Sequence, residues 1–153
     1  MQTRIFLNMA AGALSCIMLT SISHAETFEV KMLNRNHTGA MAYEPDFLHI
    51  QPGDKVKFIA TNSTHNAASI EGMLPAGAKP FIGKINEEIE IGFSEAGLYG
   101  IKCVPHYAMG MVMLIQVGQN PPLEKLQIPA QVPARAQQRL QAIVQRASAT
   151  VTP

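Results

Sequence analysis

The sequence predicts an all-β sandwich followed by a helical extension. Apolar and polar residues alternate with a period of two through much of residues 26–118, which is typical of strands with one buried face. Short runs rich in Gly, Pro, Asn and Ser separate these segments, as expected of turns. Because there is no βαβ alternation and no glycine-rich phosphate loop, a nucleotide-binding fold is not expected.

The strands are predicted segment by segment from this alternation. Tyr99, Ile101 and Cys103 share one face of a strand, so the thiol is expected on the core side of a strand end. The last strand is nearly all apolar, which predicts burial on both of its faces. This last strand is predicted at 111–117, and the other segments with strand character are 28–32, 47–51, 56–60 and 89–93.

The chain changes character after residue 119. Prolines interrupt it, and helices are predicted at Leu123–Gln127 and at Ala134–Ala147. Apolar side chains recur along one stripe of the second helix, which predicts packing against the sandwich. The expected boundaries are therefore 26–119 for the sandwich and 120–153 for the helical extension.

Residues 1–25 are predicted to be a secretory signal peptide that is removed. Arg4 precedes a mostly apolar stretch from Ile5 to Ile22, and small residues at Ser23 and Ala25 suit cleavage after Ala25. Polar residues interrupt the stretch, which disfavours a membrane anchor, and no later segment of the sequence is apolar enough to span a membrane.

Cleavage changes the charge and the number of thiols. The 153-residue chain has a formal net charge of +1, and the loss of Arg4 leaves none, so the basic excess of nucleic-acid-binding proteins is absent. Cys16 is also lost, which leaves Cys103 as the single cysteine of the mature chain. An unpaired cysteine in an exported protein is a reactive thiol, an intermolecular link or a metal ligand.

A metal site is predicted in the loop that begins at Cys103. His106 and Met111 lie three and eight positions further on, so one loop between two strands brings a thiolate, an imidazole and a thioether together. His65 lies between two candidate strands, where its side chain can reach the same end of the sandwich. Two imidazoles, a thiolate and a weak axial thioether are the ligand set of blue-copper electron-transfer sites.

Two of these ligands have rivals in the sequence. Met109 can serve as the thioether, but Met111 is favoured because it begins the inward face of the last strand. His37 and His49 compete with His65. The first lies in a polar turn and the second on the outer face of a strand, so both are expected at the surface.

The loop Cys103-x-x-His106-x-x-x-x-Met111 makes the chain resemble the cupredoxins, and among them the pseudoazurins. The His65-Asn66 pair, Tyr99, and the prolines that lead into the helical extension match as well, so the resemblance covers roughly residues 26–150. It implies an eight-stranded Greek-key sandwich with two C-terminal α-helices. It also implies one type I copper ion per chain, bound by the four residues named above.

The resemblance further implies a function. It implies a periplasmic electron shuttle that commonly serves a copper nitrite reductase, and we expect a cytochrome-type electron donor. The chain is expected to be a monomer without catalytic activity of its own. His106 is expected to be the point of electron entry and exit, and Asn66 is expected to offer its backbone N–H to the Cys103 sulfur. Five lysines are candidates for steering an acidic partner: Lys55, Lys57, Lys79, Lys84 and Lys102.

Other functions remain open at the level of sequence. A Cu(I) chaperone or storage protein is suggested by the methionine content, with nine methionines in the chain. A Cys–His hydrolase is a weaker alternative, because the loop supplies no third group to orient His106. Zinc can occupy the same ligand set, but it offers no redox chemistry.

Overall fold

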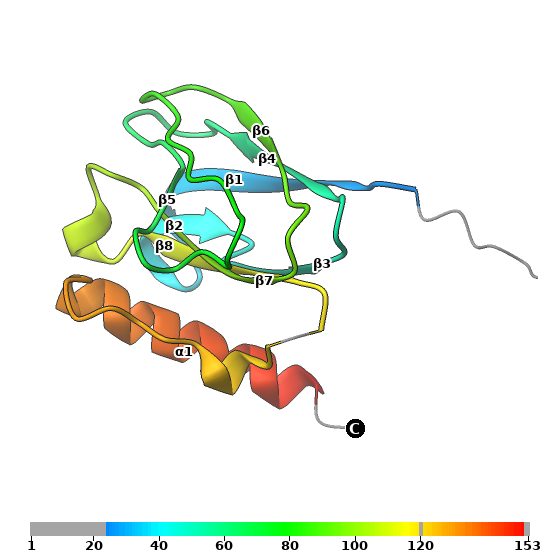
Figure 1. Cartoon of the computed structure of the whole chain (residues 1–153). Coiled ribbons are helices and arrows are strands. Elements are labelled where there is room, and N and C mark those ends of the chain that lie inside the picture. Colours follow the sequence, from blue (N-terminus) through cyan, green and yellow to red (C-terminus); the bar gives the residue numbers. More distant parts are fainter. Residues whose placement is uncertain (1–23, 120, 152–153) are drawn as a thin grey trace, which may run out of the picture.

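The computed structural model describes residues 24–119 and 121–151, and these form a β-sandwich with a helical extension (Figure 1). The predicted signal peptide lies outside the described residues, except for residues 24 and 25. The strands are β1 (Thr27–Asn36), β2 (Gly39–Glu44), β3 (Phe47–Ile50), β4 (Lys55–Ile59), β5 (Ala68–Ser69), β6 (Ile89–Gly92), β7 (Gly97–Lys102) and β8 (Val112–Val117).

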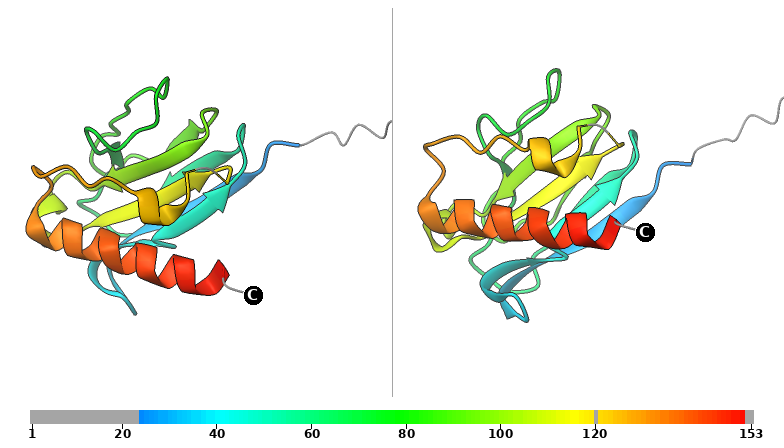
Figure 2. Two further views of the ribbon diagram at one scale, coloured as in Figure 1. Left: turned by 60° about the horizontal axis from the view of Figure 1, so that its bottom comes forward. Right: turned by 90° about the horizontal axis from the view of Figure 1, so that it is seen from below.

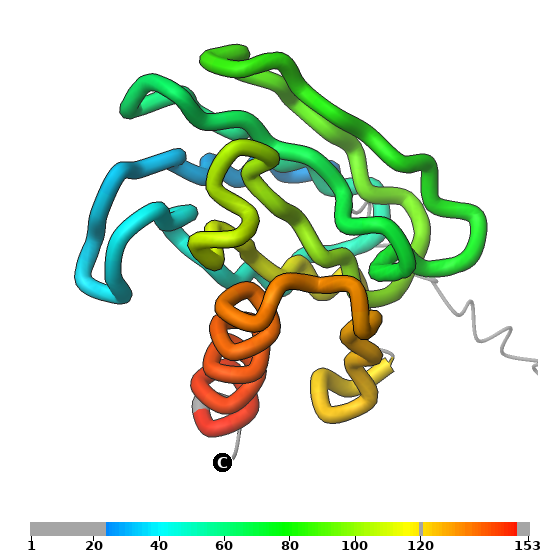
Figure 3. Tube along the Cα trace, turned by 90° about the vertical axis from the view of Figure 1, so that its left-hand side faces the viewer, coloured from blue at the N-terminus to red at the C-terminus, as the bar shows by residue number. Residues whose placement is uncertain are grey.

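The eight strands form two four-stranded sheets. The first sheet has the order β2-β1-β4-β6 and the second the order β3-β8-β7-β5. The pairs β1–β4 and β3–β8 are parallel, and the other neighbours are antiparallel. The chain therefore passes repeatedly from one sheet to the other, and Figure 3 shows the two layers stacked on each other. This arrangement confirms the predicted all-β sandwich.

Strand β8 is buried throughout because each of its faces has a different cover. Met113 and Ile115 point between the sheets, into the main core. Val112 and Leu114 point outward and pack against clusters that include the helix α1 (Ala134–Val151). The prediction that the last strand is buried on both faces is thus confirmed.

Helix α1 lies across the outer face of the second sheet (Figure 2). Ala136, Leu140 and Ile143 on its apolar stripe are fully buried, as the sequence predicted. The other predicted helix, Leu123–Gln127, is instead a single 3-10 turn at Leu123–Lys125. The segment has prolines on both sides, and two i→i+3 hydrogen bonds satisfy its backbone, so it does not extend into an α-helix. The described residues therefore contain one C-terminal α-helix where the resemblance implied two. None of their helices is long and apolar enough to cross a membrane.

Candidate metal centre

The loop between β7 and β8 is closed by its own backbone. Cys103 follows β7 directly, and its N–H donates to the carbonyl of Met111 at 3.0 Å. The N–H of Met111 donates to the carbonyl of His106 at 3.1 Å, and the N–H of His106 to the carbonyl of Cys103 at 3.2 Å. Gly110 follows a 3-10 turn at Tyr107–Met109 with a left-handed φ of 88°, a conformation that favours glycine. These bonds hold the three predicted ligands of this loop close together.

His65 reaches the same place from the loop between β4 and β5. Its carbonyl accepts a hydrogen bond from the N–H of Asn86 at 2.8 Å, and the side chain of Asn86 accepts one from the N–H of Thr64 at 2.6 Å. A neighbouring loop thus grips the backbone on both sides of the histidine. The described structure thus brings His65 together with Cys103 and His106.

The side chains of His65, Cys103 and His106 form a compact triangle of donor atoms. The two Nδ1 atoms lie 3.1 Å apart, and the Cys103 Sγ lies 3.7 Å from the Nδ1 of His65 and 3.5 Å from that of His106. A transition metal about 2.0–2.3 Å from each atom would separate them by roughly 3.3–3.8 Å. This triangle is the one group of three or more His, Cys, Asp or Glu side chains with metal-ligand spacing in the part of the chain that the structure describes.

The environment of His65 prepares its Nδ1 for a metal. Its Nε2 lies 2.8 Å from the Oδ1 of Asn34, an acceptor, so Nε2 carries the proton and Nδ1 keeps its lone pair. Burial lowers the pKa of His65, and the nearby His106 lowers it further. The imidazole is therefore held neutral, which is the form that binds metals.

The thiol of Cys103 is buried, and backbone N–H groups donate hydrogen bonds to its sulfur. Burial raises its pKa, while hydrogen bonds from the backbone N–H groups of Asn66 and His106 act in the opposite direction. The Asn66 side chain also accepts the N–H of Val104 at 2.8 Å and donates to the carbonyl of Gly83 at 2.8 Å. Asn66 thus ties the two ligand loops together and meets the sulfur, as predicted.

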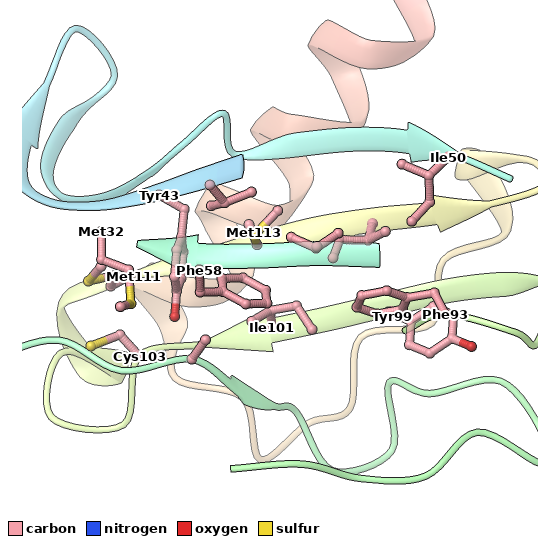
Figure 4. Close-up of a cluster of buried hydrophobic side chains, with 14 of the residues drawn as sticks. Met32, Tyr43, Ile50, Phe58, Phe93, Tyr99, Ile101, Cys103, Met111 and Met113 are labelled. Atoms are coloured by element: carbon pink, nitrogen blue, oxygen red, sulfur yellow. The ribbon is translucent and has the colours of Figure 1, made fainter. Parts of the chain in front are cut away.

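The methionines at this end differ in their burial. Met111 is fully buried beside Cys103 in the main core (Figure 4). In contrast, 44% of Met109 is exposed. If a thioether completed this donor set from the buried side, burial would favour Met111 over Met109. Met32 in β1 belongs to the same core cluster as Met111, and no pattern in the sequence set it apart from an ordinary core residue.

Comparisons with known proteins identify the family. The model of the copper binding proteins of the plastocyanin/azurin family matches residues 30–118. The pseudoazurin of Paracoccus pantotrophus is 42% identical over 88% of this chain and 93% of its own length. This chain is a member of the pseudoazurin family.

Solved pseudoazurin structures share the fold as well. The pseudoazurin of Methylobacterium extorquens AM1 matches with a TM-score of 0.73 and 36% identity, over 79% of this chain and 98% of that one. The native pseudoazurin of Hyphomicrobium denitrificans matches with a TM-score of 0.71 and 35% identity, over 78% and 97%. Pseudoazurins are copper-binding electron carriers, and the donor triangle of this chain fits a type I copper site.

The rival histidines lie where the sequence predicted. His37 is exposed in the turn between β1 and β2, and His49 is exposed on β3, where its ring contacts the carbonyl of Gly118 at 2.9 Å. Sequence reasoning missed Asn34, the side chain that orients His65. A polar residue at an exposed strand position carries no signal that it reaches a histidine 31 positions away.

Proposed function

We propose that this chain is a periplasmic one-electron carrier, without catalytic activity of its own, that binds one copper ion through His65, Cys103, His106 and Met111. The observation that carries the proposal is the triangle of two Nδ1 atoms and one Sγ with separations of 3.1–3.7 Å. Bound copper supplies a one-electron Cu(II)/Cu(I) couple, which a mixed set of imidazole and sulfur ligands supports in both states.

The chain's own contribution is to hold these ligands still. The loop from Cys103 to Met111 is fixed by backbone hydrogen bonds, His65 by Asn34, and the two loops by Asn66. Side chains that already stand at their metal-binding positions have little to rearrange when an electron arrives or leaves. Burial of His65 and Cys103 also excludes water from the site.

His106 is the proposed point of electron transfer. It is partly exposed, whereas His65 and Cys103 are fully buried. The four large hydrophobic side chains that are most exposed among the described residues all belong to the ligand loop or to the 82–85 segment beside His65: Ile82, Ile85, Val104 and Met109. Such a surface suits a small, weak and short-lived interface with a redox partner.

The candidate steering lysines do not act alike in this proposal. Lys55 lies 2.9 Å from Glu90, and Lys57 lies 3.5 Å from Glu88, so each has a neutralising partner. Lys102 lies beside the ligand loop with its Nζ 5.0 Å from the ring centroid of Tyr107. We therefore assign any steering of an acidic partner to Lys102 first, together with Lys84 and Lys79.

The proposed acceptor is a copper nitrite reductase, and the proposed donor is a cytochrome-type protein. Membership of the pseudoazurin family supports an exported electron carrier, and the exposed apolar surface supports partners that dock briefly. Stopped-flow mixing of the reduced protein with a copper nitrite reductase tests this pairing. Reoxidation no faster than with an unrelated copper oxidase would count against it.

The copper site itself is tested by spectroscopy. The copper-loaded, oxidised chain should show an intense visible thiolate-to-copper band and should cycle reversibly in voltammetry. Cys103→Ser should abolish the band, and Met111→Leu should keep it but alter the potential, whereas Met109→Leu should change neither. A protein that binds Cu(I) tightly but forms no stable Cu(II) state would instead be a chaperone or storage protein.

A further inference from the structure

We infer that helix α1 positions the ligand loop from outside, and that Arg139 anchors the part of the helix next to this loop, while Arg146 further along α1 pairs with Asp46 at 2.6 Å. Because this role concerns the copper loop, it rests on the proposed function. Arg139 is a positioning residue here, since it meets no ligand directly and acts through the backbone that it holds.

Arg139 ties α1 to the start of β2 with two hydrogen bonds. Its Nη1 donates to the carbonyl of Met41 at 2.6 Å and its Nη2 to the carbonyl of Ala40 at 3.0 Å. Met41 has a φ of 51°, unusual for a residue with a side chain, so a strained backbone is held at this point. A Cβ at Gly39 would lie 3.1 Å from Nη2, so glycine leaves room for the guanidinium. Both elements therefore contribute to the contact: α1 supplies the guanidinium, and the start of β2 supplies the two carbonyls and the space at Gly39.

The first turns of the same helix form the outer wall of the ligand loop. A Cβ at Gly110 would lie 3.1 Å from the carbonyl oxygen of Arg135, so the loop and the helix backbone are in close contact. Tyr107 of the loop packs on a cluster that includes Ala136 and Leu140 of α1. The helix thus meets the loop between His106 and Met111, the two ligands on either side of that contact.

The middle of the loop depends on this wall more than its ends do. Cys103 and Met111 are joined to each other through the backbone at the ends of β7 and β8. The segment that carries His106 is supported by the loop's own turn bonds, by the contact of the Asn66 side chain with the N–H of Val104, and by the helix. Loss of the Arg139 anchor should let α1 shift, and should move His106 relative to Cys103.

Arg139→Met tests this role, with Gln138→Met as a control. Gln138 is the exposed neighbour of Arg139 on the same helix, and no hydrogen bond of its side chain is found among the described residues. In the metal-free protein, amide exchange at Met109, Gly110 and Met111 should become about tenfold faster in Arg139→Met, because hydrogen bonds from a charged donor are lost. Arg139→Lys, which can reach one carbonyl, should restore part of the protection. The control should match the wild type.

The copper-loaded proteins give a second readout that a purely structural role would not change. Arg139→Met should shift the visible band ratio and the electron paramagnetic resonance parameters, with Arg139→Lys in between. A uniform rise of exchange over all strands with an unchanged spectrum would overturn the positioning role. A wild-type protein without a thiolate-to-copper band would instead refute the proposed function, while the exchange data would still report on the anchor.

A second observation, independent of the first, concerns the first residue of the expected mature chain. The backbone nitrogen of Glu26 donates to the Oδ1 of Asp54 at 2.9 Å, and the N–H of Gln51 donates to Oδ2 at 2.7 Å. The carbonyl of Glu26 accepts from the N–H of Lys55 at 2.8 Å. Only 6% of Asp54 is exposed, so a carboxylate is buried directly against this nitrogen.

We propose that signal-peptide removal places a new ammonium group on this carboxylate and thereby stabilises the fold. A signal peptidase hydrolyses the Ala25–Glu26 bond with one water, which leaves a carboxylate on Ala25 and an α-ammonium on Glu26. The ammonium group keeps the hydrogen bond to Asp54, and its positive charge now lies next to the negative carboxylate. A hydrogen bond between two charged groups is stronger than one from a neutral peptide N–H.

A double-mutant cycle tests this ion pair. The chain beginning at Glu26 is compared with a chain that keeps residues 24 and 25, each with Asp54 and with Asp54→Asn, by urea unfolding of the metal-free protein. With Asp54 present, the processed chain should have an unfolding constant about tenfold smaller than the extended one. With Asp54→Asn, that difference should disappear.

Two results would overturn the processing role. One is an equal stability of the processed and extended chains, or a difference that persists in Asp54→Asn. The other is a mass spectrum of the exported protein that shows a mature chain beginning at a residue other than Glu26. Acetylation of the Glu26 amine provides a further check, because it should reproduce the loss seen with the extended chain.

Discussion

The two sheets of the sandwich differ in their cover. In the second sheet, β8 is buried throughout and β7 nearly so, whereas β4 and β6 of the first sheet alternate between buried or half-buried and exposed positions. Helix α1 accounts for the difference, because it covers the outer face of the second sheet (Figure 2). The first sheet instead carries paired charges on its outer face.

The two sheets also contribute differently to the site. Cys103, His106 and Met111 all lie on the loop between β7 and β8, the two strands that are covered on both sides. His65 comes from the crossover between the sheets and is oriented by Asn34 of the first sheet. A metal ion bound there would therefore join a firmly packed sheet to a more open one.

The largest expected effect is on the stability contributed by helix α1, which covers the second sheet. Leu140→Ala removes a fully buried side chain between α1 and the second sheet, and it should lower the free energy of unfolding by about 2–5 kcal/mol. Urea unfolding of the metal-free protein measures the loss. Ile91→Ala in β6, which is only half-buried, should cost less, and the exposed Gln141→Ala should change stability by less than about 0.5 kcal/mol. Similar losses for Leu140 and Ile91 would remove the contrast between the sheets.

The next effect concerns the link between the sheets. Asn34→Leu removes the acceptor for the Nε2 of His65, so the imidazole loses its fixed orientation and tautomer. Copper affinity should fall about 10–100-fold, as measured by competition with a Cu(I) chelator. Arg35→Gln, an exposed neighbour on β1, is the control and should bind like the wild type. Unchanged affinity in Asn34→Leu would mean that His65 is held by its backbone alone.

A smaller effect is expected where α1 meets the ligand loop. Gly110→Ala places a methyl group 3.1 Å from the carbonyl of Arg135 at a φ of 88°, so it should cost about 1–2 kcal/mol and shift the visible spectrum. Gly92→Ala in β6 is the matched control. Nothing lies within 4 Å of a Cβ there and φ is not left-handed, so stability should stay the same or rise slightly. Equal effects at the two glycines would show that the helix does not constrain the loop.

The covered sheet was easier to predict from the sequence than the open one. The apolar run at 111–117 predicts burial on both faces of its strand, the helical stripe through Leu140 predicts packing against the sandwich, and both predictions are confirmed. The strands β2 and β5 were missed. The first is rich in small residues without clear alternation, and the second has only two residues, so pairing with neighbouring strands rather than local sequence defines them.

The convergence of the three ligands on one loop was predicted because their spacing is local. Cys103, His106 and Met111 lie within nine residues of each other, so one turn is enough to bring them together. The role of Asn34 could not be predicted, since it depends on how the loop after β4 folds back onto the neighbouring strand β1. The lysine pairs were missed for a similar reason. Lys57 and Glu88 are brought together by the register of β4 with β6, which the sequence alone does not fix.

The smallest effect is expected on the open face of the first sheet. The Lys57 Nζ lies 3.5 Å from a Glu88 carboxylate oxygen, and their side chains are 41% and 47% exposed. Water and salt screen such a pair, so Glu88→Gln should cost no more than about 0.5 kcal/mol, and added salt should shrink even that. Urea unfolding at low and high ionic strength measures both. If Glu88→Gln lowered the free energy of unfolding as much as Leu140→Ala, this face would have to be covered rather than open to water. The contrast between the two sheets would then be wrong.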